Sequence, residues 1–202
     1  MESVLHRLFS QCLEAPYITV ENQGSFAVRK KGCHLTLFFE KSSGVTDWKN
    51  NLDFPCVPYR DMGTLWFCHR GFLKVWKSIE PYLIKTIQDP GIRRVTVVGY
   101  SHGAALAALC HEYIWFHRPD LRGHLVGFGF GCPRFYWGLL PRQALLRRWD
   151  TFFPIRNGRD LVTHLPPVFL GYRHVQKVLP VGEKNKYSPI DAHRAENYLL
   201  EL

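Results

Sequence analysis

Apolar runs and stretches of helical spacing follow one another along this chain. The runs that predict strands are rich in β-branched and aromatic residues and lie at 17–20, 25–28, 33–39, 94–98, 125–130 and 151–156. The stretches that predict helices lie at 72–87, 103–116 and 136–148. Strands and helices in this order are typical of an α/β protein with a mainly parallel sheet that helices cover on both faces.

Three shorter signals add detail to this pattern. Pro81 lies inside the helix predicted over 72–87, so we expect it to kink or split that helix. The alternating residues at 172–179 predict a further strand. A serine, a proline and an acid in the segment 188–191 fit the N-cap, N1 and N3 positions of a helix, which predicts the start of a C-terminal helix.

The composition is that of a globular protein with an excess of positive charge. The chain has 202 residues, of which 46% are hydrophobic and 14% aromatic, and this suits the core of one domain. The formal net charge of +9 favours anionic partners, such as an acidic lipid surface. Nucleic-acid binding is not expected, because the basic clusters at 29–31 and 147–148 lack interleaved aromatic residues and a nucleic-acid-binding motif.

The sequence predicts neither a targeting segment nor disulfides. Charged residues interrupt the beginning of the chain, so a signal peptide is not expected, and no apolar run is long enough to predict a membrane-spanning helix. The six cysteines are scattered without a C-x-x-C pair, which is typical of reduced, buried thiols in a cytosolic protein. We therefore expect a cytoplasmic location by default.

A chemistry-bearing motif joins one predicted strand to the helix that follows it. Gly99, Tyr100, Ser101, His102 and Gly103 match G-x-S-x-G, the pattern of a nucleophile elbow. In such an elbow a serine stands on a tight, strained turn, and the glycines remove Cβ atoms that would collide with the strand and the helix. The backbone N–H of His102 then points to the place where a tetrahedral oxyanion would form.

A serine nucleophile needs a base, and an acid that orients the base. In the chain order Ser, acid, His that α/β-hydrolases use, Asp160 fits best because it follows the strand predicted at 151–156. Asp150 precedes that strand and would face the wrong end of the sheet. Asp120 lies in a turn at the exit of a helix.

Three histidines follow the acid, and the residues alone leave all three open. His164 is close behind Asp160, His174 lies within a predicted strand, and His193 lies at the start of the last predicted helix, where it is able to reach Ser101. Metal binding is a weaker interpretation of these histidines, because the chain has no H-E-x-x-H motif and no cysteine pair with zinc spacing.

A series of segments resembles, in the right order, the motifs of the class 3 lipase family, which are fungal-lipase-like α/β-hydrolases. These segments read FFEKSSGVTDWKNNL, CHRGF, VVGYSHGAALAAL, FGFGCPRF, RNGRDLVTHLPP, GYRHV and DAHRAENYL. They resemble the family's oxyanion loop and lid, its H-x-G-F, its serine elbow, its F-G-x-P-R, its N-x-x-D-x-V-x-x-L-P-P, a stretch with an aromatic residue and His, and a terminal H-x-x-Y. Together they cover nearly the whole chain.

The resemblance implies a fold and a lid. It implies a single-domain α/β-hydrolase over residues 1–202, with a mostly parallel central sheet, helices on both faces and a short helical lid at 43–52. The apolar side of this lid would carry Val45, Trp48 and Leu52.

The resemblance also implies which residues carry the reaction. Ser101 would be the nucleophile, Asp160 the orienting acid and His193 the base. The backbone N–H of His102 and the backbone N–H and hydroxyl of Ser42 would form the oxyanion hole. No metal and no organic cofactor is implied.

The chain departs from the family pattern in the oxyanion loop and in the serine elbow. Lys41 stands where the family has a glycine in the oxyanion loop, so Ser43 is an alternative oxyanion donor. Tyr100 replaces the family's usual His, and Ala104 replaces its second Gly. His102 replaces its usual Leu, and the ring is expected to narrow the acyl site or to add a donor.

The function predicted from these features is a lipase-like serine carboxyl-ester hydrolase that cleaves acylglycerols or similar lipids. One alternative is a phospholipase or acyltransferase that uses the same triad at anionic membranes, where Lys41 and Lys49 flank the predicted lid. The other alternative is a non-catalytic interaction protein that retains the fold.

Overall fold

A seven-stranded sheet runs through the computed structural model, which describes residues 3–39, 53–138 and 142–202. Its strands, in the order in which they lie side by side, are β1 (Ile18–Thr19), β2 (Ser25–Lys31), β3 (His34–Phe39), β6 (Arg94–Tyr100), β7 (Leu125–Phe130), β9 (Phe152–Asn157) and β11 (Leu179–Val181). Neighbouring strands from β3 to β11 are parallel, whereas β1 pairs with β2 and β2 with β3 in antiparallel fashion. The mainly parallel sheet predicted from the sequence is confirmed.

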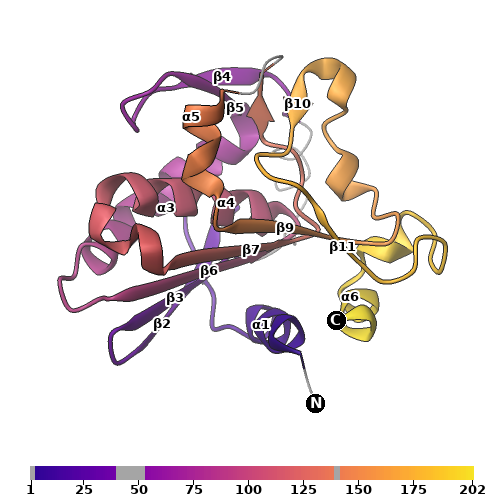
Figure 1. The fold of residues 1–202 in the computed structure, drawn as a ribbon, viewed down its shortest axis with the longest axis horizontal. Coiled ribbons are helices and arrows are strands. Elements are labelled where there is room, and N and C mark those ends of the chain that lie inside the picture. The colour runs from indigo at the N-terminus through magenta and orange to yellow at the C-terminus, as the bar shows by residue number, and fades with distance from the viewer. Residues whose placement is uncertain (1–2, 40–52, 139–141) are drawn as a thin grey trace.

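Helices cover both faces of this sheet (Figure 1), as the sequence predicts. One face carries α3 (Arg70–Ile87) and α4 (His102–His117), and the other carries α1 (Val4–Leu13) and α6 (Ala195–Glu201). A short helix, α5, spans Gln143–Leu146. The 3-10 helices are η1 (Glu21–Gln23), η2 (Pro119–His124), η3 (Arg147–Trp149), η4 (Val162–His164), η5 (Val168–Leu170) and η6 (Asp191–His193).

Helix α1 was not predicted from the sequence, although its apolar residues have helical spacing. Leu5, Leu8, Phe9 and Cys12 recur at intervals of three and four residues and pack into the core on the α1 face of the sheet. Ser3 caps this helix, since its Oγ accepts a hydrogen bond from the backbone N–H of His6 at 2.9 Å. The buried residues of this helix pack in one core with the C-terminal ends of β6 and β7.

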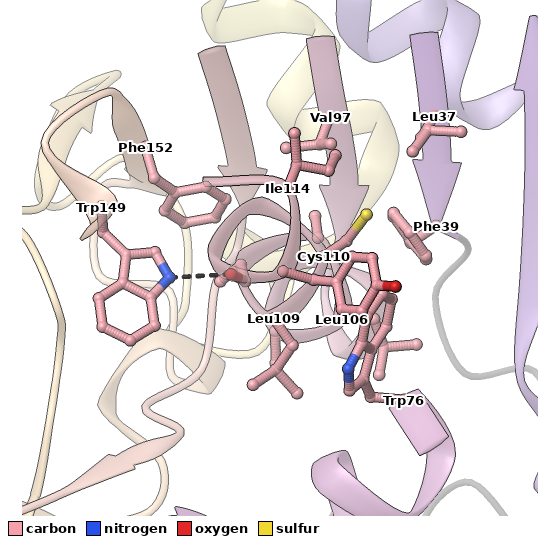
Figure 2. Packing of buried hydrophobic residues seen from close by; sticks show 14 of the residues in the cluster. Leu37, Phe39, Trp76, Val97, Leu106, Leu109, Cys110, Ile114, Trp149 and Phe152 are labelled. Carbon is pink, nitrogen blue, oxygen red and sulfur yellow. Dashed lines mark hydrogen bonds between the residues drawn. The ribbon is translucent and has the colours of Figure 1, made fainter. Parts of the chain in front are cut away.

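The core on the opposite face is built around α4. The residues of α4 from His102 to Ile114 are buried, and its alanines let the helix lie close to the sheet. Figure 2 shows the side chains around it, which include Leu37, Phe39, Trp76, Val97, Trp149 and Phe152. Trp149 satisfies its buried indole N–H by donating to the carbonyl of Ala108 at 2.8 Å.

A second, antiparallel sheet was not predicted. Its strands, in spatial order, are β10 (Tyr172–Arg173), β8 (Tyr136–Trp137), β5 (Trp66–His69) and β4 (Cys56–Tyr59). The helix predicted over 136–148 is wrong at its beginning, because Tyr136 and Trp137 pair with β5 instead. Aromatic residues of this kind fit a strand when a partner is present, and that partner lies far away in the sequence.

Two helix predictions need correction in detail. α3 continues through Pro81, so the predicted split does not occur. Pro81 is exposed, so its ring lies on the solvent side of the helix. The C-terminal helix starts later than predicted: Ser188 does cap a turn by accepting from the N–H of Asp191 at 3.1 Å, but this turn leads into η6 and α6 begins only at Ala195.

Segment 172–179 is not one strand, because only Tyr172 and Arg173 form β10 and the next strand starts at Leu179.

All six cysteines lie in the described ranges and none of them forms a disulfide, as predicted; Cys33 is nevertheless exposed and Cys56 only half-buried. Over the described residues, no helix has the length and apolar character needed to cross a membrane.

His111 is a fully buried imidazole in the middle of α4. Its Nε2 lies 3.1 Å from Thr151 Oγ1, and its ring packs edge-on against Phe152. Burial lowers the pKa of His111 to about 3, because the charged form loses its hydration. In the unfolded chain the same histidine binds its proton near pH 6.5. The contribution of the neutral, buried His111 to the free energy of unfolding should therefore be fully present above about pH 6.5 and be lost as the pH falls toward 3.

We predict that His111→Gln makes stability less sensitive to acid. The amide is able to keep the hydrogen bond to Thr151 but takes up no proton, so the variant should lose about 2 kcal/mol less than the wild type between pH 7 and pH 5. Urea unfolding at both pH values measures this difference, and His124→Gln sets the baseline for the loss of an exposed imidazole. An equal loss of stability in wild type and His111→Gln would contradict the prediction.

Candidate active site

Ser101 lies on the tight turn between the end of β6 and the start of α4. Its backbone has φ 57° and ψ −124°, a region that residues with a side chain rarely adopt. A Cβ on Gly99 would lie 2.1 Å from the carbonyl oxygen of Gly103, so only glycine fits before the turn. The steric reason for the first glycine of the motif is therefore confirmed. Strain of this kind is common where a side chain is held ready for chemistry.

A chain of hydrogen bonds joins Ser101 to His193 and Asp160. Nε2 of His193 lies 2.8 Å from Ser101 Oγ, and Nδ1 of the same ring lies 2.9 Å from Asp160 Oδ2. Because a carboxylate only accepts, Nδ1–H donates to Asp160, which leaves Nε2 to accept the hydroxyl proton of the serine. The three residues singled out from the sequence thus come together from the turn after β6, the loop after β9 and η6.

The other two histidines that the residues left open point elsewhere. Nε2 of His164 lies 3.5 Å from a guanidinium nitrogen of Arg156, and Nε2 of His174 lies 2.8 Å from the carbonyl oxygen of Thr163. Burial lowers the pKa of His174 to about 4, so this ring is neutral near pH 7.

Asp160 is fully buried, and donors surround its carboxylate. Besides His193, Oδ2 accepts from the hydroxyl of Tyr198 at 2.7 Å, and Oδ1 accepts from the backbone N–H of Val162 at 2.9 Å. Burial and the neighbouring Asp160 raise the pKa of Tyr198 well above its usual value, so the phenol keeps the proton that it donates. These bonds fix the orientation of the carboxylate toward the imidazole.

The turn that carries His193 is tied to the sheet by a buried amide. Nδ2 of Asn157, at the end of β9, donates to the carbonyl oxygens of Ala192 at 3.1 Å and of Asn197 at 3.2 Å. Neither Asn157 nor Tyr198 was assigned a role from the sequence. Both lie in segments that resemble family motifs, and this position within a motif is the sequence feature that could have marked them as part of the site.

A cavity of about 680 Å³ opens beside Ser101 Oγ. Ser101 and His193 contribute polar groups to its wall, and most of the remaining wall is apolar. The apolar side chains include Phe54, Phe72, Pro133, Leu161, Leu165 and Ile190. A largely apolar cavity with a few converging polar groups is suited to an organic ligand with an extended apolar part.

His102 lines the same cavity and is the first residue of α4. Its ring contacts Phe72, another residue of the cavity wall, edge-on with 5.1 Å between ring centroids. The other predicted oxyanion donor, Ser42, lies outside the described residues. The predicted lid at 43–52 lies outside them as well, with its apolar residues Val45, Trp48 and Leu52.

Within the described ranges, no group of three or more His, Cys, Asp or Glu side chains is placed to hold a metal ion.

Solved structures of fungal lipases share this fold. A Rhizomucor miehei lipase in complex with its propeptide superposes with a TM-score of 0.69 at 25% identity, over 83% of this chain and 55% of that chain. A lipase from Rhizopus microsporus var. chinensis superposes with a TM-score of 0.70 at 20% identity, over 86% of this chain and 62% of that chain. The α/β-hydrolase fold implied by the sequence motifs is therefore confirmed.

Sequence relatives agree with this fold. A lipase of Rhizomucor miehei is 30% identical over 147 residues, which are 68% of this chain and 39% of the relative. A secreted mono- and diacylglycerol lipase of Malassezia globosa is 36% identical over 128 residues, which are 57% of this chain and 38% of the relative. The chain thus spans under two fifths of the length of these relatives.

The Malassezia relatives are named as secreted proteins, which does not support the cytoplasmic location expected from the sequence. Residues 36–170 match the family model described as lipase, class 3. This match covers the serine elbow, the acid and more than half of the chain, and the chain therefore belongs to the class 3 lipase family.

Proposed function

We propose that this protein is a serine carboxyl-ester hydrolase that cleaves lipid acyl esters through an acyl-enzyme on Ser101. The observation that carries the proposal is the hydrogen-bonded series from Ser101 Oγ through His193 to Asp160 at the wall of an apolar cavity. Serine hydrolases that form an acyl-enzyme use this order of nucleophile, base and orienting acid. Membership of the class 3 lipase family supports the same chemistry.

In the proposed reaction His193 Nε2 takes the hydroxyl proton as Ser101 Oγ attacks the ester carbonyl. Asp160 holds the ring in the tautomer that leaves Nε2 available, and it stabilises the imidazolium that forms. The oxyanion develops beside the N-terminus of α4, where the backbone N–H of His102 and the positive end of the helix dipole favour negative charge. His193 then returns the proton to the leaving alcohol, and water releases the acid from Ser101 by the same steps in reverse order.

The cavity supports a lipid as the substrate class. Its apolar side chains suit the hydrocarbon part of an acyl chain, while the ester carbonyl lies at Ser101. The Malassezia relatives carry the name mono- and diacylglycerol lipase, which supports acylglycerols as substrates here.

We predict that Ser101→Ala lowers turnover of p-nitrophenyl esters by at least about 10³-fold, because the nucleophile is lost. Ser78→Ala, which removes a serine hydroxyl on α3 far along the chain from the motif, serves as the control and should keep full activity. A fluorophosphonate should label the wild type at Ser101 only. Wild-type turnover that survives in a pure preparation of Ser101→Ala would contradict the assignment, and an unlabelled, inactive wild type would favour an interaction protein.

Gly131 gives the imidazole the room that this chemistry requires. It adopts φ +59°, and a Cβ at this position would lie 2.7 Å from Cε1 of His193 and 3.1 Å from Oδ2 of Asp160. Any side chain at 131 would therefore push against the base and the acid together. Gly32 has the same φ of +59°, but a Cβ added there would have no neighbour within 4 Å, so this position reports backbone strain alone.

We predict that Gly131→Ala lowers kcat by about 10²-fold, since displacement of a catalytic group by about 1 Å has effects of that size. Gly32→Ala should cost comparable stability through its positive φ and leave kcat unchanged. Ester turnover and thermal unfolding of both variants measure the two effects. Equal kcat in Gly131→Ala and wild type would show that the site tolerates the added methyl group.

An exposed apolar turn that follows the cavity-lining Pro166 in the chain supports contact with a lipid surface. Val168, Phe169 and Leu170 form η5 and are exposed by 47%, 86% and 44%. The turn is anchored rather than loose, because the indole N–H of Trp137 donates to the carbonyl of Leu170 at 2.8 Å. Three consecutive apolar side chains held toward water favour contact with an apolar partner.

Basic residues lie near this turn along the chain. The segment 161–182 contains no acidic residue and carries Arg173 and Lys177, both exposed. The guanidinium of Arg134 donates to carbonyls of the segment that precedes the turn, those of His164 and Pro166, at 2.5 and 3.0 Å. Apolar side chains with basic neighbours are suited to an anionic membrane surface, and we include that surface among the proposed partners.

We predict that Phe169→Ser weakens binding to vesicles of phosphatidylcholine and phosphatidylserine by roughly tenfold or more, because it removes the apolar group that enters the lipid. Leu200→Ser, at a residue 72% exposed on α6, is the matched control and should bind like the wild type. Co-sedimentation in the Ser101→Ala background separates binding from hydrolysis. Equal binding of Phe169→Ser and Leu200→Ser would contradict this part of the proposal. So would equal binding of the protein without either change to vesicles with and without phosphatidylserine.

A further inference from the structure

Tyr100 lies directly before the nucleophile and makes two contacts with His193. Its hydroxyl donates a hydrogen bond to the backbone carbonyl oxygen of His193. Its ring also stacks on the imidazole, with 5.3 Å between the ring centroids and 27° between the ring planes. One side chain of the elbow therefore holds both the main chain and the ring of the residue that faces Ser101.

Tyr100 is itself held in place by the core on the α1 face. It is 3% exposed, and its ring meets Phe9 of α1 edge-on at 5.2 Å and Tyr198 of α6 at 6.0 Å. Burial and the nearby Asp160 raise the pKa of the Tyr100 phenol, so it keeps its proton and remains a hydrogen-bond donor. The contact with His193 is thus made by a rigid group.

His193 needs such support because it does not lie on a long helix or on the sheet. It ends the three-residue turn η6, and its side chain is 20% exposed at the cavity wall. Its two nitrogens are held by the hydrogen bonds to Asp160 and Ser101. The imidazole plane is still able to rotate about the line that joins these two nitrogens. A ring stacked on the imidazole face opposes this rotation.

We propose that Tyr100 is a positioning residue for His193, through the hydrogen bond to its carbonyl oxygen and the stack on its imidazole. This inference rests on the proposed function in assigning His193 as the base. The phenol replaces the histidine that is usual at this place in the family pattern, so the device belongs to this chain's own sequence. Tyr100 also lines the cavity, but only 3% of it is exposed, so its loss should lower kcat much more than it changes KM.

The test compares two substitutions that remove the contacts in steps. Tyr100→Phe keeps the ring and loses the hydroxyl, and Tyr100→Leu loses both. Relative to wild type, kcat for a p-nitrophenyl ester should fall roughly fivefold in Tyr100→Phe, as for one hydrogen bond, and about 10²-fold in Tyr100→Leu, with KM nearly unchanged. The rate of fluorophosphonate labelling at Ser101 should fall by similar factors.

Tyr17→Phe is the matched control. Tyr17 also packs against the α1-side core and donates its hydroxyl to a backbone carbonyl, that of Cys12 at 2.5 Å, without contacting His193. It should lose a comparable amount of stability, measured as Tm, and keep the wild-type kcat. If Tyr100→Leu has a lower Tm than wild type but the same kcat, Tyr100 contributes to stability only, and the proposal is overturned.

A second readout does not depend on turnover. The Nδ1 proton of His193, which lies between the ring and Asp160, is followed by NMR and assigned by its loss in His193→Gln. In Tyr100→Leu this signal should broaden because the proton exchanges faster with solvent, whereas loss of the tyrosine ring current alone would only shift it; Tyr17→Phe should leave it as in wild type. If the wild type hydrolyses no ester, the proposed function fails, and the NMR comparison still decides the positioning role: a broadened signal supports it and a signal of wild-type width overturns it.

Discussion

The backbone at Ser101 is the constraint on which the site depends. Its φ of 57° and ψ of −124° cost about 1–3 kcal/mol, and the turn persists because β6 and α4 are both fixed in the core. The two elements approach so closely that Gly99 has no space for a side chain against Gly103. The strain sets the hydroxyl at the edge of the sheet, where the loop after β9 and the turn η6 bring Asp160 and His193 to meet it.

Elements with a strong local pattern could be predicted from the sequence, and elements that depend on distant partners could not. The strand at β6 and the helix α4 were predicted because a buried apolar run and an alanine-rich stretch define them locally. The sequence predicts a helix where β8 lies, because Tyr136 and Trp137 form a strand only through their pairing with β5. The single strand predicted over 172–179 is wrong for a similar reason, since the alternation of apolar and polar residues does not reveal where β10 ends.

The site shows the same division between local and distant signals. Ser101 follows from its motif, and Asp160 follows from the rule that the acid comes after a strand. The choice of His193 over His164 and His174 needed the family resemblance, because spacing does not say which imidazole reaches the serine. The support from Tyr198 was not predicted, since a buried phenol at the end of the chain looks like any core residue until its partner, Asp160 Oδ2, is located.

The central claim is that an acyl group passes through Ser101, and the most direct measurement is to trap that intermediate. A wild-type reaction with a slowly hydrolysed ester is quenched with acid within the first turnover, and the protein is digested and studied by mass spectrometry. We expect the acyl mass on the peptide that contains Ser101 and its disappearance in Ser101→Ala. Hydrolysis that proceeds with no acyl adduct, or with an adduct on another residue, would contradict the claim.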